Sequence, residues 1–197
     1  MNLPNKITVF RIILAFTFMV FLFLNGVGAK FLALFTFVLA SVSDFLDGYI
    51  AKNTNSITDF GKLMDPIADN VSTLSAFLAF VQMQLVPAWI VVIIIFRELV
   101  ITGLRVLALA KKEVLPASLD GKHKTVSQMV SILTILVFIL LREMGIVLFK
   151  VWEEPLEYWF RQAIFILMLI TVTLTIISGV SFLWKNRRFI IGNGEAG

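Results

Sequence analysis

Six long apolar stretches dominate this 197-residue chain and restrict what it can fold into. A helix needs about 20 consecutive, mostly apolar residues to cross the hydrocarbon core of a bilayer, and each stretch comes close to that length. The chain is 59% hydrophobic and 15% charged, far more apolar than a typical soluble domain. The sequence therefore predicts an all-α, polytopic membrane protein with six transmembrane helices, at residues 8–25, 29–51, 62–82, 86–110, 124–141 and 159–184.

The first residues predict a short helix that lies in the membrane interface before the first span. Residues 3–11 mix two basic side chains with three large apolar ones, a pattern typical of interfacial helices. The segment lacks the features of a cleaved secretory signal, so we expect it to be retained. Residues 1–190 are predicted to form a single domain, with a flexible tail at 191–197.

Lysine and arginine are distributed unevenly between the two ends of the six predicted spans. The richer side has Lys6, Arg11, Lys52, Lys62, Lys111, Lys112, Lys122, Lys124, Lys185, Arg187 and Arg188, and the poorer side has Lys30, Arg142, Lys150 and Arg161. Basic residues favour the cytoplasmic side of a membrane. We therefore expect a multi-pass protein of the cytoplasmic (inner) cell membrane, in contact with membrane lipid, with both termini on the cytoplasmic side and no nucleic-acid partner.

Four aspartates, Asp44, Asp47, Asp65 and Asp69, interrupt the second and third apolar stretches. An ionised aspartate costs roughly 2.5 to 3.5 kcal/mol at the depth of a membrane helix, so four of them need a compensating interaction. Their spacings of three and four residues place each pair on one helical face. Two such faces turned toward each other would bring four carboxylates together, enough for two divalent ions, and oxygen ligands suit Mg²⁺, Mn²⁺ or Ca²⁺.

Small residues around the aspartates leave room for a ligand. Gly48 and Ala51 follow the first pair, and Gly61 precedes the second. Pro66 is compatible with a first helical turn, so we expect the third helix to begin near Asp65 with its positive end toward an anion. A phosphate is the expected ligand, although small residues also pack membrane helices without binding anything.

These residues resemble the signature of the CDP-alcohol phosphatidyltransferases, DxxDGxxAR followed by GxxxDxxxD. Seven of the eight fixed positions match with the spacing kept, and the departure is a lysine in place of the arginine. The opening MNLPNKITVFRI and the segments GKLMDPIADN, FRELVITGLR and GKHKT resemble one branch of that family, the bacterial phosphatidylglycerophosphate synthases. Here the signature reads Asp44, Asp47, Gly48, Ala51 and Lys52, then Gly61, Asp65 and Asp69.

The resemblance implies an activity, a cofactor and a set of site residues. The expected reaction transfers a phosphatidyl group from CDP-diacylglycerol to sn-glycerol 3-phosphate, giving phosphatidylglycerophosphate and CMP. All four aspartates would hold two Mg²⁺ or Mn²⁺ ions, Asp69 would also act as general base, and a homodimer is expected. The residues implied for CDP-diacylglycerol binding are Asn5, Thr8, Asp47, Gly48, Ala51, Lys52 and Gly61.

The acceptor would bring a second phosphate close to four aspartates, so basic residues must offset its charge. Arg97 and Arg105 are eight residues apart and hence near one helical face, and Lys122 and Lys124 follow in the next predicted loop. We expect these four residues to bind the acceptor phosphate. The competing interpretation of Arg97 is an ion pair with Glu98 that closes the helix bundle.

Other interpretations remain open at this point. A divalent-cation transporter also carries carboxylates in the membrane, but it should spread them along a path rather than gather them at one end. A purely structural membrane protein would leave the aspartates unexplained. Within the family, the same metal site would serve inositol phosphate, serine or phosphatidylglycerol as acceptor. The sole histidine, His123, is expected to be a solvated loop residue.

Overall fold

The computed structural model describes residues 3–54, 59–111, 119–187 and 189. Within these ranges, the side chains of residues 3–9, 44–54, 59–69, 109–110, 119–120 and 122 are not described. The described chain is entirely helical and contains no strand, which confirms the predicted all-α class. Its elements are α1 (Leu3–Phe23), α2 (Val27–Thr54), α3 (Asp59–Gln82), α4 (Ala88–Ala110), α5 (Leu119–Met144), the π-helical turn η1 (Gly145–Phe149) and α6 (Glu154–Lys185).

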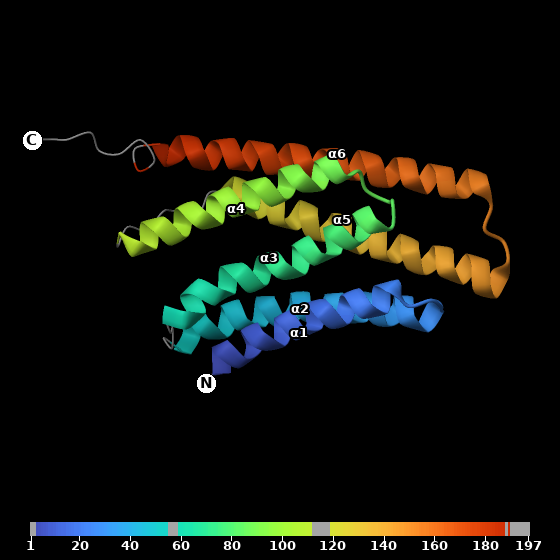
Figure 1. Cartoon of the computed structure of the whole chain (residues 1–197), viewed down its shortest axis with the longest axis horizontal. Coiled ribbons are helices and arrows are strands. Elements are labelled where there is room, and N and C mark those ends of the chain that lie inside the picture. The colour runs from blue at the N-terminus through green and yellow to red at the C-terminus, as the bar shows by residue number, and fades with distance from the viewer. Residues whose placement is uncertain (1–2, 55–58, 112–118, 188, 190–197) are drawn as a thin grey trace, which may run out of the picture.

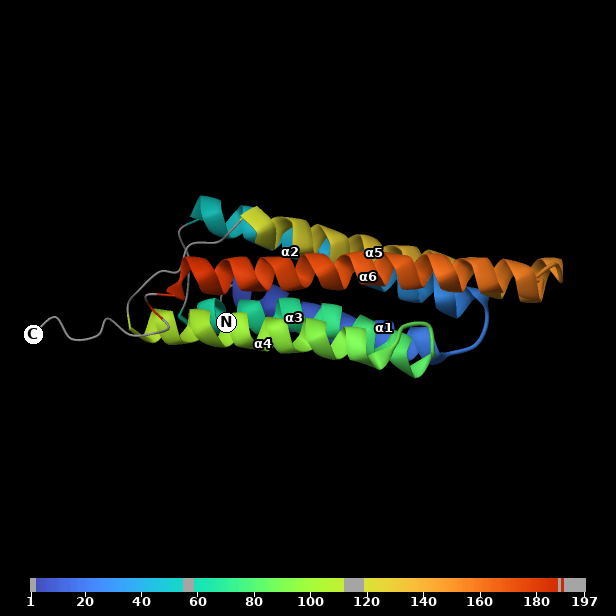
Figure 2. The ribbon, with the colours of Figure 1, turned by 90° about the horizontal axis from the view of Figure 1, so that it is seen from above.

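The helices run up and down in one elongated bundle (Figure 1). Helix α1 packs against α2 and α3, α5 packs against α2 and α6, and α4 packs against α3 and α6. Seen from above, α6 runs between α5 on one side and α4 on the other (Figure 2). The first turn of α1, the last turn of α6 and the adjoining ends of α2 and α3 all lie at the same end of the bundle (Figure 1). We call this the aspartate end.

The connections at the opposite end show how the sequence stops and restarts helices. Gly26 has a φ of 101°, a left-handed conformation that favours glycine, and it separates α1 from α2. The ammonium group of Lys30 donates hydrogen bonds to the carbonyl oxygens of Leu22 (2.7 Å) and Leu24 (2.9 Å). It thereby satisfies acceptors at the end of α1 that have no partner within the helix. Pro155 occupies the first turn of α6, where its missing N–H costs little.

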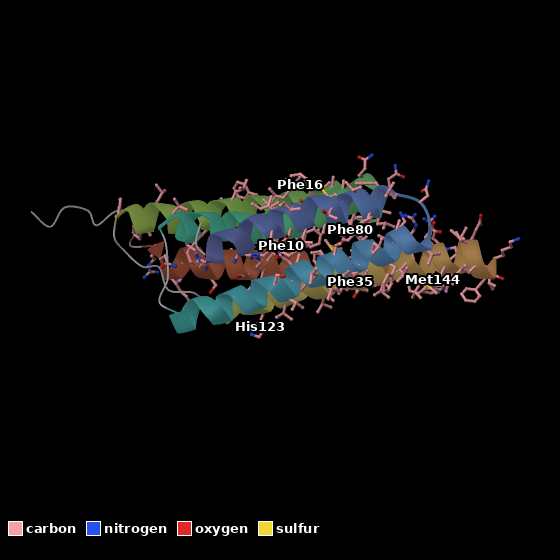
Figure 3. All side chains as sticks on the ribbon, turned by 90° about the horizontal axis from the view of Figure 1, so that it is seen from below. Phe10, Phe16, Phe35, Phe80, His123 and Met144 are labelled. Carbon is pink, nitrogen blue, oxygen red and sulfur yellow. The ribbon has the colours of Figure 1, made fainter. Side chains whose placement is uncertain are left out.

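Apolar side chains fill the interior of the bundle and also cover much of its outside. Phe80 is fully buried among the helices, whereas Phe10, Phe16 and Phe35 are exposed (Figure 3). An exposed apolar surface of this extent is typical of a protein that contacts lipid. In a bilayer, apolar burial alone does not drive helices together, so close packing and hydrogen bonds between helices carry more of the stability.

Two helical segments are long and apolar enough to cross a membrane, His123–Phe149 and Glu154–Lys185. Shorter apolar helices occur at Phe10–Phe23, Val27–Ser43 and Asn70–Gln82. Helix α4 has three charged residues in its central and final turns. The six predicted stretches all contain helix, but the six-span topology itself stays a prediction.

Three predicted helix ends were wrong. Residues 3–11 form no separate short helix, because α1 continues unbroken from Leu3 to Phe23. Helix α3 begins at Asp59 rather than near Asp65, so Pro66 lies inside the helix and the expected anion site at a helix start near Asp65 does not exist. Helix α5 begins at Leu119, so the basic residues that were assigned to a loop lie on its first turns.

Candidate functional site

The four aspartates lie on the adjoining ends of α2 and α3. Asp44 and Asp47 belong to α2, and Asp65 and Asp69 belong to α3, so both predicted spacings fall on real helices. The two helices contact each other, and their adjoining ends form part of the aspartate end (Figure 1). The carboxylates themselves lie outside the described side chains. Their convergence on metal ions is therefore a prediction, and an all-oxygen donor set from two neighbouring helices fits divalent cations.

The residues predicted to bind CDP-diacylglycerol lie on the same three helices. Those in the first part of the chain belong to α1, which packs against both α2 and α3, and the rest belong to α2 and α3 themselves. Their side chains, like those of the aspartates, lie outside the described part, and their roles stay predictions. They are Asn5, Thr8, Asp47, Gly48, Ala51, Lys52 and Gly61. Among the described side chains, no group of three or more histidines or carboxylates could hold a metal ion.

A cluster of charged side chains, which we call the Glu98 cluster, joins α4 to α5. The carboxylate of Glu98 pairs with the ammonium group of Lys124 at 2.5 Å and with Nη1 of Arg97 at 3.3 Å. The side-chain amide of Gln128 lies 3.4 Å from the same carboxylate. Removing charges from water is costly unless they are paired and hydrogen-bonded, and these three charged groups satisfy one another.

Arg97 has more donors than the Glu98 cluster satisfies. Its Nη2 donates to the hydroxyl oxygen of Ser178 on α6 at 2.7 Å, but its buried Nε has no acceptor among the described residues. Leaving a buried donor unpaired costs about 1 to 3 kcal/mol, more when the group is charged. An anionic ligand or a water molecule would remove that penalty.

Arg105 lies near the cluster without joining its ion pairs. Its guanidinium lies 5.5 Å from the ring centroid of Phe182 on α6, in a cation–π contact. It is close enough to Arg97 and Lys124 to repel both electrostatically. Three positive charges therefore surround the one negative charge of Glu98, an excess of two that suits a dianionic phosphate.

The structure thus brings together two of the four residues predicted for the acceptor phosphate, Arg97 and Lys124, and places Arg105 nearby. The side chain of Lys122 lies outside the described part. The ion pair between Arg97 and Glu98 is present as the competing interpretation expected. His123 is exposed and points away from the bundle, as a solvated residue should, but it lies on α5 and not in a loop (Figure 3).

Sequence reasoning missed a polar seam between α5 and α6. Ser127 and Ser131 share hydrogen bonds with Thr171, at 2.9 and 2.6 Å. The hydroxyl of Thr175, one turn further along α6, donates to the carbonyl oxygen of Thr171 at 2.7 Å. Hydroxyls three and four residues apart on α6 continue to Ser178 and so to Arg97. That spacing was a readable signal, because it places all three on one helical face.

One further tie joins α3 to α4 beside the last aspartate. The side-chain amide of Asn70 donates to the hydroxyl oxygen of Thr102 at 3.1 Å. Asn70 directly follows Asp69, so this bond restrains the rotation of α3 about its axis at the predicted base. The sequence singled out Asn70 only as a departure from the family branch.

An all-helical bundle with an apolar exterior and a buried charge cluster is typical of a helical membrane protein. The model of the CDP-alcohol phosphatidyltransferase family matches residues 1–190, and the chain belongs to that family.

Three relatives have related names. The chain is 39% identical to the CDP-diacylglycerol–glycerol-3-phosphate 3-phosphatidyltransferase of Bacillus subtilis over 147 residues, which is 68% of this chain and 76% of the relative. It is 34% identical to a probable phosphatidylglycerophosphate synthase of Mycobacterium tuberculosis over 97% of this chain and 84% of the relative. The transferase of the same name as the first from Rickettsia bellii is 40% identical over 65% of this chain and 71% of the relative.

Proposed function

We propose that this protein transfers the phosphatidyl group of CDP-diacylglycerol to sn-glycerol 3-phosphate, giving phosphatidylglycerophosphate and CMP. The relatives named for this reaction, at 34 to 40% identity, support the assignment. The observation that carries it within the molecule is the Glu98 cluster together with Arg105, because their excess positive charge matches an acceptor that carries its own phosphate. An acceptor without a phosphate, such as serine, would give that excess no partner.

The donor site is proposed at the adjoining ends of α2 and α3. Asp44, Asp47, Asp65 and Asp69 would hold two divalent ions, Mg²⁺ or Mn²⁺. When bound, such ions stabilise the negative charge that develops on the phosphoryl oxygens and on the departing CMP. Residues of α1, α2 and α3, from Asn5 and Thr8 to Gly61, would form the cytidine pocket. Lys52 would attract a phosphate as a point charge, without the bidentate geometry of arginine.

The transfer itself needs a base and an oriented acceptor. Asp69 accepts the proton of the primary hydroxyl of glycerol 3-phosphate. The hydroxyl oxygen then bonds to the lipid-bearing phosphorus, while the bond from that phosphorus to the oxygen of CMP breaks. Arg97, Arg105, Lys122 and Lys124 hold the acceptor's phosphate so that its free hydroxyl faces the donor, which lowers the entropy cost of the reaction.

The membrane setting is proposed on the charge distribution of the sequence. The aspartate end would face the cytoplasm, together with both termini, and the lipid chains of the donor would enter from the cytoplasmic leaflet. Six spans and a homodimer complete the proposal. Accessibility of single cysteines introduced at Arg187 and at Lys150 to an impermeant thiol reagent tests the orientation, since only the first should be protected in intact cells.

Release of CMP from CDP-diacylglycerol tests the reaction. Purified full-length protein with Mg²⁺ or Mn²⁺ should release CMP with glycerol 3-phosphate and much less with inositol phosphate, serine or phosphatidylglycerol. Chelation of the divalent ions should stop the release. Absence of CMP release with glycerol 3-phosphate alone among these acceptors would reassign the substrate and keep the family.

Asp69→Asn tests the proposed base. The amide keeps the shape of the side chain but cannot accept the proton, so turnover should fall below detection while the variant still binds a CDP-containing nucleotide. The matched control is Asn70→Ala, next in the chain, which removes the bond to Thr102 and should retain measurable turnover. Normal turnover of Asp69→Asn would remove Asp69 from the chemistry.

A further inference from the structure

Helix α6 contacts both arginines of the proposed acceptor site, although no motif in the sequence gave this helix a role. Ser178 accepts a hydrogen bond from Nη2 of Arg97 at 2.7 Å. Phe182, one turn further along, lies under the guanidinium of Arg105. Ser178 and Phe182 are both buried, so their positions are set by the packing of α6 rather than by solvent.

Gly179 provides the space that Arg97 occupies. A Cβ atom at this position would lie 3.1 Å from Cγ of Arg97 and 3.9 Å from its Nε. The first distance is tighter than ordinary van der Waals contact, so any larger residue would displace the stem of the arginine. Glycine at this position therefore lets Arg97 run along α6 to reach Ser178.

The direction of the Arg97 guanidinium follows from these contacts. Glu98 holds Nη1 and Ser178 holds Nη2, so two opposed partners fix the plane of the group and leave the buried Nε unpaired. A planar guanidinium held at two nitrogens can present its remaining N–H groups in one direction only. Without Ser178, the Glu98 pair alone would let it rotate.

We propose that Ser178, Gly179 and Phe182 of α6 are positioning residues that aim Arg97 and Arg105 at the phosphate of the acceptor substrate. The inference rests on the proposed function, since it assumes that these arginines bind that phosphate. Ser178 and Gly179 act through Arg97, and Phe182 acts through Arg105. None of the three touches the acceptor.

Steady-state kinetics of Ser178→Ala provide the main test. With saturating CDP-diacylglycerol, the KM for glycerol 3-phosphate should rise roughly three- to tenfold, the effect of losing one hydrogen bond to a charged group. The kcat and the KM for CDP-diacylglycerol should stay near their wild-type values, which also shows that the variant is folded. Ser178→Thr, which keeps the hydroxyl, should restore most of the affinity.

A control on the same helix separates positioning from packing. Thr175→Val also removes a buried hydroxyl, but that hydroxyl bonds only to the backbone of α6 and not to Arg97. Its KM for glycerol 3-phosphate should be unchanged. An equal rise in both variants would mean that any buried hydroxyl of α6 has this effect, and would overturn the inference.

A double-mutant cycle shows whether Ser178 acts through Arg97. In an Arg97→Ala background, Ser178→Ala should cause no additional rise in KM, because its partner is already gone. Fully additive effects would contradict the positioning role. An unchanged KM in Arg97→Ala alone would overturn both this inference and the proposed acceptor site, whereas a rise in Arg97→Ala without one in Ser178→Ala would overturn the inference alone.

Two further pairs test the other positioning residues. Gly179→Ala should raise the KM for glycerol 3-phosphate, whereas Gly28→Ala should not, because a Cβ at Gly28 meets no atom within 4 Å. Phe182→Leu should raise it through Arg105, whereas Phe80→Leu, at an equally buried phenylalanine near the opposite end, should not. Equal effects within either pair would remove that residue from the proposal.

Discussion

Glu98 and Glu157 each hold two basic side chains, but at different depths in the bundle. Glu98 pairs with Arg97 and Lys124, and the exposed fractions of these three side chains are 7, 12 and 9%. Glu157 pairs with Arg142 at 3.1 Å and Arg161 at 2.8 Å, with exposed fractions of 21% for the carboxylate and 40% for each arginine.

The two clusters have different surroundings and hence different consequences. Glu157 also accepts a hydrogen bond from the indole of Trp152, and Arg161 donates to the backbone carbonyl of Gln84. That cluster joins α5, α6 and the turn after α3 at the end opposite the aspartates, where water can solvate its charges. It is a clasp between helices, and surface pairs of this kind contribute little to stability.

The Glu98 cluster has a higher energetic cost and therefore asks for a reason. Its charges are largely removed from solvent, and apolar residues of the same volume would often be equally stable there. It also keeps an unpaired buried donor on Arg97. The comparison indicates that buried charge in this bundle serves ligand binding, whereas exposed charge serves assembly.

Glu98→Gln should give the largest effect, because it leaves Arg97 and Lys124 without a counter-charge in the interior. Breaking one partner of a buried ion pair costs about 3 to 5 kcal/mol. We expect a strongly reduced yield of folded protein in detergent, a lower thermal midpoint and a higher KM for glycerol 3-phosphate. A stability equal to that of the wild type would show that the two cations find other partners, and the contrast with Glu157 would disappear.

Arg105→Ala should have an intermediate effect that is confined to the acceptor. It removes a cation beside the cluster but breaks no ion pair, so folding should be little affected. The KM for glycerol 3-phosphate should rise roughly tenfold, as expected for one charge-assisted contact, with kcat nearly unchanged. An unchanged KM would move the acceptor site away from α4. Arg142→Ala, another exposed-side arginine but at the opposite end, is the matched control.

Glu157→Gln should have the smallest effect. An exposed pair contributes roughly 0.2 to 1 kcal/mol, so the thermal midpoint should fall slightly and turnover should be retained. In 1 M salt the difference from wild type should shrink further, since salt screens exposed charges, while the deficit of Glu98→Gln should persist. A loss of turnover in Glu157→Gln would give the clasp a catalytic consequence that the present comparison does not assign to it.

The positions of the helices could be predicted closely from the apolar stretches, and the errors lie at helix ends. The predicted third start near Asp65 relied on Pro66, but α3 begins at Asp59 and includes that proline. Residues 119–123 were assigned to a loop because they are polar, yet they form the first turns of α5. Polarity marks where a helix leaves the apolar layer, not where its backbone hydrogen bonds stop.

The candidate site divides in the same way. The aspartates and the two arginines of α4 were readable because their type and spacing are unusual in an apolar chain. Ser178 was not, because it lies 81 residues from Arg97 and looks like an ordinary residue of a membrane helix. Gly179 likewise carries no signal until the stem of Arg97 is seen against it.

The sequence alone determined the helical class, the approximate helix positions, the family signature and the excess of positive charge on α4, since composition and local periodicity are properties of neighbouring residues. Only the tertiary structure decided that Glu98 pairs with Lys124, that α6 holds Arg97 and Arg105, and that Glu157 closes the opposite end. These contacts join residues of different helices. They depend on how each helix is rotated and packed, which is set by the whole bundle and not by any one segment.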